Sequence, residues 1–241
     1  MVSPRAAGGL RGPVTDTFFV AIDGPAGSGK SSVSKQVARR LGFGYLDTGS
    51  VYRALAWHVL NRGDSTDEAS AVESAFGAFE PAISLDPDDR SISVGGTDVT
   101  DAIRTPETTA AVAGVAKTMS VREKINELFR RIVAEAPQSG VVVEGRDITT
   151  VVAPDAPARI LLTAHPDVRA ARRSAEMGSA DVAKVAEAMR RRDASDSTVV
   201  DFMNAADGVV AVDTTHLDFD QSVDAVLSVI AERREGGRDG R

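Results

Sequence analysis

The chain has 241 residues, and none of them is cysteine. A disulfide framework, a zinc-thiolate site and a thiol nucleophile are therefore excluded, and a reducing compartment is the natural setting. The sequence also lacks a run of 18 apolar residues, and its first 16 residues lack the apolar segment of a signal peptide. We expect a soluble cytoplasmic protein. Residues 1–16 are rich in Gly, Pro and Ala without periodicity, which indicates a disordered tail.

Basic residues are in the minority, because 28 Lys and Arg stand against 35 Asp and Glu and give a formal net charge of −7. This balance argues against a general nucleic-acid surface or an anionic-membrane surface. Residues 169–192 depart from this balance, because basic residues, mostly arginines, outnumber acidic residues there. We therefore expect a small anionic ligand. The length allows one good core, no internal repeat is visible, and we expect one domain with an insertion.

The most informative stretch is 24–32, which matches the phosphate-loop pattern G-x-x-x-x-G-K-[ST]. Glycine lets backbone N–H groups converge on phosphate oxygens, Lys30 supplies an ammonium group, and Ser31 can coordinate Mg²⁺. A buried strand at 18–22 precedes the loop, and apolar residues at helical spacing follow it from 33 to 41. This context predicts a nucleotide site, whose loop residues are Gly24, Pro25, Ala26, Gly27, Ser28, Gly29, Lys30, Ser31 and Ser32.

Strands and helices alternate along most of the chain, with one antiparallel interruption. The patterns predict further parallel strands at 42–46, 141–147, 159–163 and 208–213, and three short antiparallel strands at 82–85, 91–94 and 97–100. Besides the helix after the phosphate loop, helices are expected to start at Asp47-Thr48, at Thr105, at Ser120 and at Asp218, and an arginine-rich helical region follows the strand at 159–163. Ser120 and Glu123 have the spacing of a capping box.

Several arginines occupy positions that suggest ligand contact. Arg53 and Arg122 lie in the first turns of helices, where a cation opposes the helix dipole, so a bound anion would explain them. A solvated arginine is the alternative for Arg53. Arg146 and Asp147 end a buried strand, and ligands bind beyond the carboxyl ends of parallel strands. An ion pair between these two neighbours is the alternative.

Together these features predict a kinase that closes over two ligands. Phosphoryl transfer needs positioning and charge neutralisation more than covalent chemistry. An acceptor that is already a phosphate needs no strong base. The planar guanidinium groups of Arg53 and Arg146 match phosphate geometry.

From about Phe18 to the C-terminal helix the chain resembles bacterial cytidylate kinases. The stretches 45–54 (YLDTGSVYRA) and 141–157 (VVVEGRDITTVVAPDAP) are more specific than the phosphate loop alone. The other stretches are 22–32, 98–104, 121–122, 169–173 and 190–198. The resemblance implies an α/β fold of the P-loop NTPase type, with a five-stranded parallel sheet, helices on both faces, an antiparallel and helical acceptor-binding insertion, and a lid.

The resemblance also implies the reaction, in which ATP with Mg²⁺ phosphorylates CMP or dCMP to give CDP or dCDP and ADP. It implies a monomer without nucleic-acid or membrane partners. The expected kinase domain is 17–241, with a core at about 17–75 and 140–241, an insertion at about 76–139 and a lid at about 168–198.

Site residues follow from the resemblance as well. Arg122 and Asp147 resemble readers of the cytosine edge, because a carboxylate accepts from the exocyclic amine and would repel the carbonyl of uracil. The catalytic set is Lys30, Arg146, Asp147, Arg169 and Arg173. Arg172 joins the phosphate loop in binding ATP, and Ser31 is the metal ligand. The acceptor-binding set is Thr48, Tyr52, Arg53, Arg104, Arg122, Arg146, Asp147, Arg192 and Asp196.

The chain departs from the family pattern at several positions. Ala113 replaces a usual serine, Val199 a usual arginine and Thr149 a usual glycine, and a Pro-Leu pair is missing from 200–203. Either Arg190 or Arg191 substitutes for the lost arginine, or acceptor affinity is low. A kinase for another acceptor such as UMP, AMP or a non-nucleotide, and a non-catalytic nucleotide-binding module, are the alternatives. A GTPase is disfavoured because the sequence has no N-K-x-D motif.

Overall fold

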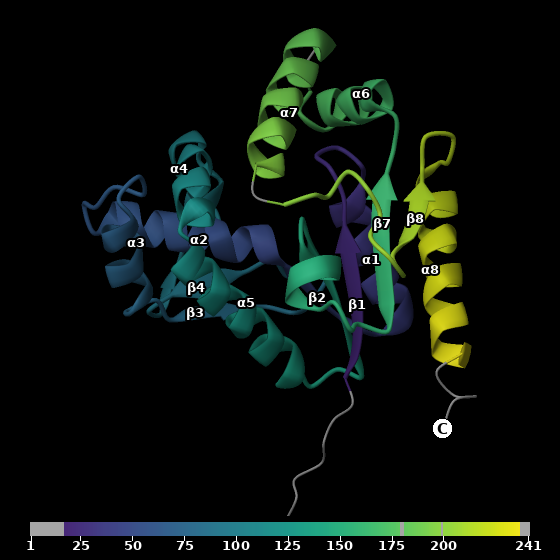
Figure 1. Cartoon of the computed structure of the whole chain (residues 1–241), viewed down its shortest axis with the longest axis horizontal. Coiled ribbons are helices and arrows are strands. Elements are labelled where there is room, and N and C mark those ends of the chain that lie inside the picture. Colours follow the sequence, from purple (N-terminus) through teal and green to yellow (C-terminus); the bar gives the residue numbers. More distant parts are fainter. Residues whose placement is uncertain (1–16, 179–180, 199, 237–241) are drawn as a thin grey trace, which may run out of the picture.

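The computed structural model describes residues 17–178, 181–198 and 200–236. The predicted tail at 1–16 and the substitution at Val199 lie outside these residues. Figure 1 shows a central sheet flanked by helices, with the insertion on one side of it and two helices beyond one edge. Within the described residues, no helix has the length and apolar character needed to cross a membrane.

A five-stranded parallel sheet forms the centre of the molecule, as predicted, in the order β2-β6-β1-β7-β8. Its middle strand β1 pairs with β6 on one side and β7 on the other. The loop after β1 therefore leaves from the middle of the carboxyl edge, where ligands of such sheets bind. The strands are β1 Phe18–Asp23, β2 Gly44–Asp47, β6 Gly140–Gly145, β7 Ala158–Thr163 and β8 Val210–Asp213.

Strand β2 begins two residues later than the predicted 42–46. The reason is Gly42, which ends the preceding helix α1 (Lys30–Leu41) with a φ of 65° and donates its N–H to Arg39 O. The chain becomes extended only after this left-handed residue.

Both faces of the sheet are buried, which explains the continuous apolar runs of its strands. Val20 and Ile22 of β1 pack on the face covered by α1 and by α8 (Phe219–Gly236). Ala21 packs on the opposite face, in a core that also contains residues of the insertion helices. The final helix α8 is preceded by Asp218, which accepts the Gln221 N–H at 2.8 Å, as the predicted cap requires.

The insertion contains the predicted antiparallel sheet, with strands shorter than expected and the order β3-β4-β5. Just before the insertion lies a short helix over 69–76, which was not predicted from the sequence. The strands of the insertion are β3 Pro81–Ile83, β4 Ile92–Val94 and β5 Thr97–Asp98. The helices on this side of the molecule are α2 Thr48–Asn61, α3 Ala69–Phe76, η1 Ala102–Arg104, α4 Pro106–Lys117 and α5 Met119–Ala134.

The predicted capping box of Ser120 and Glu123 is wrong. Helix α5 begins at Met119 after Thr118, and Thr118 makes no side-chain cap bond. Ser120 lies one residue inside the helix, and its hydroxyl donates to Glu73 of α3 instead. The serine therefore links α5 to α3 rather than capping its own helix.

Two helices lie beyond the carboxyl edge of the sheet, at the top of Figure 1. They are α6 (Pro166–Glu176) and α7 (Val182–Ser197), and we call them the lid. Ala170, Val185 and Met189 form a small apolar cluster of their own, against which Ala26 of the phosphate loop packs. A short helical segment, η2 (Ile148–Val152), connects β6 toward β7.

Candidate active site

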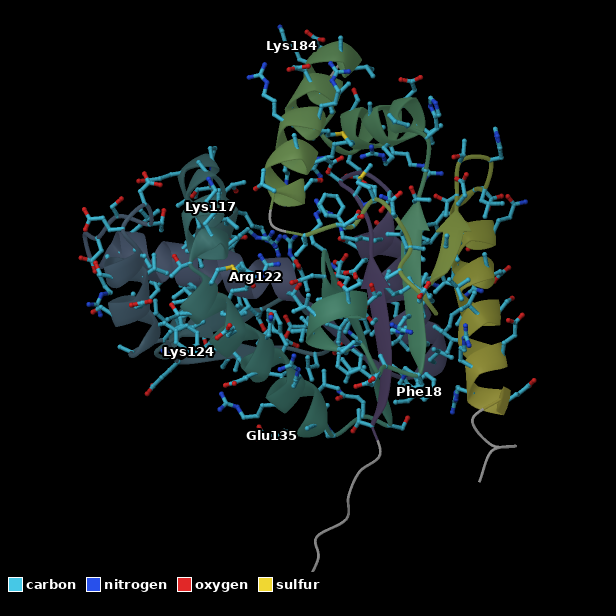
Figure 2. All side chains as sticks on the ribbon, in the orientation of Figure 1. Phe18, Lys117, Arg122, Lys124, Glu135 and Lys184 are labelled. Atoms are coloured by element: carbon cyan, nitrogen blue, oxygen red, sulfur yellow. The ribbon has the colours of Figure 1, made fainter. Side chains whose placement is uncertain are left out.

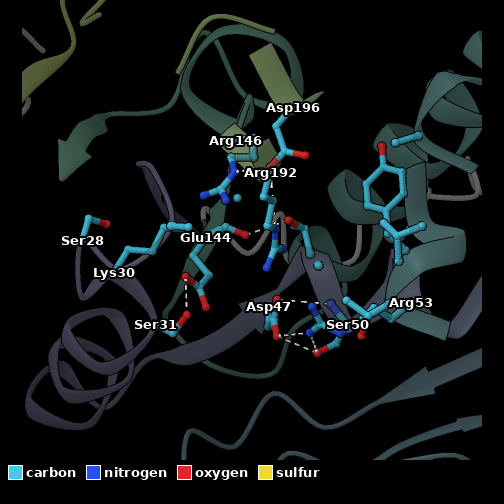
Figure 3. Close-up of a pocket in the computed structure, with 18 of the residues that line it drawn as sticks. Ser28, Lys30, Ser31, Asp47, Ser50, Arg53, Glu144, Arg146, Arg192 and Asp196 are labelled. Carbon is cyan, nitrogen blue, oxygen red and sulfur yellow. Dashed lines mark hydrogen bonds and ion pairs between the residues drawn. The ribbon is translucent and has the colours of Figure 1, made fainter. Parts of the chain in front are cut away.

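A cavity of about 950 Å³ opens at the carboxyl edge of the sheet, between the phosphate loop, the insertion and the lid. Figure 3 shows part of its lining. Most of the predicted site residues line this cavity: Ala26, Gly27, Ser28, Gly29, Lys30, Ser31, Ser32, Thr48, Tyr52, Arg53, Arg104, Arg122, Arg146, Asp147, Arg173, Arg192 and Asp196. The predicted residues outside the lining are Gly24, Pro25, Arg169 and Arg172.

The phosphate loop presents the start of α1 to the cavity. Gly27 has a φ of 71° and sits so close to the lid that an added Cβ would lie 2.6 Å from Met189 Cε. The first N–H groups of a helix have no intrahelical partner, so those after Gly29 are available to an anion. The Ser28 hydroxyl is buried and has no hydrogen-bond partner among the described residues. The loop thus offers unpaired donors where phosphates would lie.

Lys30 extends from the start of α1 toward Glu144 and Arg146 (Figure 3). Burial and the nearby Arg146 guanidinium lower the pKa of its ammonium group to about 8, although Glu144 opposes this shift. The lysine is therefore a cation that a nearby negative charge would stabilise further.

Glu144, at the end of β6, is a buried carboxylate beside the phosphate loop. The Ser31 hydroxyl donates to its Oε2 at 3.0 Å, and the Tyr45 hydroxyl donates to its Oε1. Burial raises the pKa of Glu144, while the charge of Lys30 lowers it. No group of three or more His, Asp or Glu side chains suited to a metal ion occurs in the described part of the chain. The oxygens of Ser31 and Glu144 nevertheless suit Mg²⁺, which usually keeps several waters and takes only one or two protein carboxylates.

Arg53 is held by the residue that caps its own helix. Asp47 accepts the Ser50 N–H at 3.1 Å as N-cap of α2, and its other oxygen accepts from Arg53 at 2.9 Å. Burial raises the pKa of Asp47, but Arg53 and the Ser50 bonds outweigh it, so the pKa lies below its usual value. Arg53 is therefore not merely solvated. Its Nε is buried and has no hydrogen-bond partner in the described structure.

Arg122 and Asp147 form an ion pair of 2.6 Å, and each side chain is only 8% exposed. Figure 2 places Arg122 where the insertion helices meet the sheet. Asp147 thus pairs across the cavity rather than with its neighbour Arg146. The Tyr52 hydroxyl lies close by, buried and without a described partner, and burial together with the charge of Asp147 raises its pKa. Arg122, Asp147 and Tyr52 therefore form a polar wall, in which the Tyr52 hydroxyl has no hydrogen-bond partner among the described residues.

Arg146 is fixed by groups from three segments. Its Nε donates to Asp196 of α7 at 3.0 Å, and another nitrogen donates to Gly24 O. The guanidinium also lies 4.8 Å from the ring centroid of Phe202. Arg192, the residue four positions before Asp196, stays 54% exposed and lies 3.9 Å from that carboxylate. The lid and the end of β6 therefore meet at Arg146.

The three predicted lid arginines have different surroundings. Arg173 lines the cavity and donates to Glu176 at 3.0 Å. Arg172 donates to the hydroxyl and carbonyl oxygens of Thr214. Arg169 is buried against Asp193 and the phosphate loop.

Arg104 and Thr48 line the insertion side of the cavity. Partial removal from water and the nearby Arg53 lower the pKa of Arg104, and its guanidinium makes no hydrogen bond within the described residues. Thr48 Oγ1 donates to the Glu144 carbonyl at 2.7 Å, which ties the start of α2 to the end of β6.

The departures from the family pattern are accounted for in part. Ala113 lines the cavity, where it offers no hydrogen bond. Thr149 donates its N–H and its hydroxyl to Asp23 Oδ2, at 2.8 Å and 2.6 Å, and Ile148 N–H reaches Oδ1 at 2.9 Å. Burial nevertheless raises the pKa of Asp23 to about 6. Thr149 therefore anchors the segment after Asp147 to the end of β1.

Sequence reasoning missed some residues that line the cavity. Glu144 and Asp47 both follow apolar strand residues, so their place at a carboxyl edge was a usable signal. The β3–β4 turn gave no such signal, because its distance from the phosphate loop depends on the packing of the insertion. The missed lining residues with polar or charged groups include Lys35, Tyr45, Asp47, Asp89, Arg90, Lys117 and Glu144.

Comparisons with known proteins agree on one family. A family model described as cytidylate kinase matches residues 20–232. A cytidylate kinase of Streptomyces avermitilis is 45% identical over 217 residues, which cover 90% of this chain and 94% of the relative. One of Streptomyces coelicolor is 47% identical over 225 residues, covering 93% and 97%. An uncharacterized protein from Eubacterium ventriosum, 13% identical, has a crystal structure that matches with a TM-score of 0.50 over 89% and 99% of the two chains, which supports the fold alone.

Proposed function

The chain belongs to the cytidylate kinase family and phosphorylates CMP or dCMP with ATP, and we propose that the cavity described above carries out this transfer. The proposal rests on polar groups without protein partners that lie on two opposite walls of the cavity. The phosphate loop offers Lys30 and the unpartnered Ser28 hydroxyl, while the insertion side offers Arg53 Nε and the Tyr52 hydroxyl. The cavity thus has one wall for the phosphoryl donor ATP, which we call the donor wall, and one for the phosphoryl acceptor CMP, which we call the acceptor wall.

The donor wall binds the ATP phosphates through the loop N–H groups and Lys30, whose positive charge offsets the charge that builds up on the transferred group. Ser31 and Glu144 would hold Mg²⁺ through their side-chain oxygens. When bound, the ion supplies further neutralisation of phosphate charge. Arg173 and Arg192 extend the same positive surface from the lid. Arg169 and Arg172 lie outside the cavity lining, so we assign neither a direct contact with the phosphates.

The acceptor wall holds the CMP phosphate, whose own oxygen is the nucleophile. Arg53 and Arg146 are already oriented by Asp47 and Asp196, so little conformational freedom is lost when a phosphate binds. The phosphate oxygen attacks the γ-phosphorus as the bond to the β-phosphate oxygen breaks, and ADP leaves with that oxygen. No residue has to remove a proton from the acceptor.

The Arg122 and Asp147 pair reads the base. The Asp147 carboxylate accepts from the exocyclic amine of cytosine, and the Arg122 guanidinium donates to its ring acceptors, so uracil would meet a carboxylate with a carbonyl. Tyr52 and Arg104 complete this side of the cavity, with Thr48 at its base. We further propose that the insertion at about 76–139 is the acceptor-binding part, that α6 and α7 act as the lid predicted at about 168–198, and that the protein acts as a cytoplasmic monomer.

The test is ADP release from Mg·ATP with CMP, dCMP, UMP and AMP as acceptors. Turnover confined to cytosine nucleotides is expected, with a loss of about 10²–10³-fold in Lys30→Ala, the range for removing one group that stabilises developing charge. Lys124→Ala, an exposed lysine of the insertion (Figure 2), is the matched control and keeps full activity. Val199→Arg shows whether the family arginine raises acceptor affinity. Turnover of UMP or AMP in preference to CMP would overturn the proposed specificity.

A further inference from the structure

Two buried charges lie behind the phosphate loop, outside the cavity lining and unused by the transfer itself. Asp193 of α7 is 8% exposed and Arg169 of α6 is 6% exposed. The Arg169 guanidinium donates to Asp193 Oδ2 at 2.7 Å, so the two lid helices are joined by an ion pair. Charges this deep in a protein are costly unless they are fully paired, so their other contacts matter.

Both partners also bind the backbone of one residue of the phosphate loop, Ala26. Asp193 Oδ1 accepts the Ala26 N–H at 3.1 Å, and Arg169 donates to the Ala26 carbonyl at 2.8 Å. We call this arrangement of Arg169, Asp193 and the backbone N–H and C=O of Ala26 the lid–loop contact. At the next residue, a Cβ on Gly27 would lie 2.7 Å from Arg169 O, so the loop and the lid touch directly. The loop cannot change its curvature here without moving the lid.

The same helix turn reaches the acceptor side. Asp196, three residues after Asp193, accepts from Arg146 at 3.0 Å, and another Arg146 nitrogen lies 3.9 Å from Asp193 Oδ1. Any shift of α7 relative to the phosphate loop therefore displaces the groups that orient Arg146. Because Arg146 faces the proposed acceptor phosphate, one turn of α7 connects the phosphate loop with the acceptor site, in addition to the direct bond from Arg146 to Gly24 O.

We propose that Asp193 is a positioning residue that couples the two nucleotide sites. ATP phosphates order the phosphate loop, the lid–loop contact transmits that order to α7, and α7 then holds Arg146 ready for the acceptor phosphate. The inference rests on the proposed function of the cavity. Its consequence is that ATP tightens CMP binding, and by reciprocity CMP tightens ATP binding by the same factor.

The experiment measures CMP binding by calorimetry, with and without a saturating non-hydrolysable ATP analogue and Mg²⁺. For the unmodified protein we expect the analogue to tighten CMP binding by about 5-fold or more, within the usual range of coupling between sites. In Asp193→Asn the ratio of the two CMP dissociation constants falls toward 1, while CMP binding without the analogue changes little. Asp224→Asn, an exposed carboxylate on α8 paired with Arg40, is the matched control and keeps the ratio.

A merely structural role would lower the melting temperature of Asp193→Asn and leave the ratio unchanged, and that result would overturn the inference. An unmodified protein that binds both nucleotides without any coupling would overturn it equally. An unmodified protein that binds the analogue but not CMP would contradict the proposed function instead. If Asp193→Asn does not fold, Asp193→Glu keeps the charge but displaces it from Ala26, and the same loss of coupling is expected.

Discussion

Lys30 shows how a single residue combines burial with a reactive charge. Burial and Arg146 bring the pKa of its ammonium group to about 8 in the nucleotide-free protein. A bound polyphosphate favours the protonated form and raises that pKa again. At about pH 8 the Lys30 side chain is neutral in a fraction of the molecules. In those molecules it must take up a proton when ATP binds.

We predict net proton uptake on ATP binding that grows as the pH rises through 8, where the free lysine becomes increasingly neutral, and vanishes toward pH 6, where the lysine is already protonated. Calorimetry of Mg·ATP binding in buffers of different ionisation enthalpy measures the number of protons. Lys30→Arg keeps a permanent charge, because arginine stays protonated in proteins, and should lose the uptake. Uptake that persists in Lys30→Arg would assign the proton to another group.

Individual residue types were predictable from the sequence, whereas their partners were not. The phosphate-loop sequence pattern identified Lys30 and Ser31 as site residues. The position of Arg146 and Asp147 at the end of a buried strand identified these two as well. The sequence analysis considered a pair between the last two, but Arg146 binds Asp196 and Asp147 binds Arg122. These partners lie 50 and 25 residues away, so only the folded chain brings them together.

At the scale of elements, α4 can lie directly against the loop after α2 because Gly114 has no side chain. A Cβ on Gly114 would lie 2.2 Å from the Thr66 carbonyl oxygen and 2.7 Å from its carbon, both backbone atoms that cannot turn aside. The same helix brings Ala113, Ala116 and Lys117 to the cavity. Its distance from α2 therefore helps to set the width of the acceptor side.

We predict that Gly114→Ala destabilises the protein by about 1–3 kcal/mol through overpacking, despite the better helix propensity of alanine. The displaced α4 should raise the KM for CMP more than the KM for ATP. Denaturant unfolding and steady-state kinetics measure the two effects. Gly77→Ala is the matched control, since Gly77 has an ordinary φ of −61° and its Cβ would come no closer than 3.3 Å to Ser74 O. Equal stability of the two variants would contradict the prediction.

Some features of the elements could not be predicted from local sequence patterns. Periodicity located β1, α1 and β6 well, because each buries a regular set of apolar residues. Helix α3 has only two buried residues, Val72 and Ala75, and is too short for a clear period. The spacing of Ser120 and Glu123 matched a capping box, yet Ser120 bonds to Glu73, which is 47 residues away. Such a competing partner is invisible in a local window.

For the whole molecule, the α/β order and the phosphate loop were enough to predict the sheet and its ligand edge. What they left open is the relation between the parts around the cavity. The lid reaches the phosphate loop through Asp193 and reaches Arg146 through Asp196, and the insertion reaches Asp147 through Arg122. These contacts connect segments from distant parts of the chain. The sequence therefore predicted which residues gather at the site but not the contacts that join the lid, the insertion and the phosphate loop.

The lid and the insertion are expected to move toward each other when both nucleotides bind. Arg192 is 54% exposed at the rim of the cavity, and Arg173 has only Glu176 as a recorded partner in the described structure. Efficient transfer requires water to be excluded from the phosphates, and rim cations of this kind gain partners when a cavity closes over anions. We predict that the radius of gyration falls when CMP and a non-hydrolysable Mg·ATP analogue are both present, and falls less with either one alone. X-ray scattering of the full chain measures the change, and scattering curves that superimpose with and without both nucleotides would show that the transfer proceeds in an open cavity.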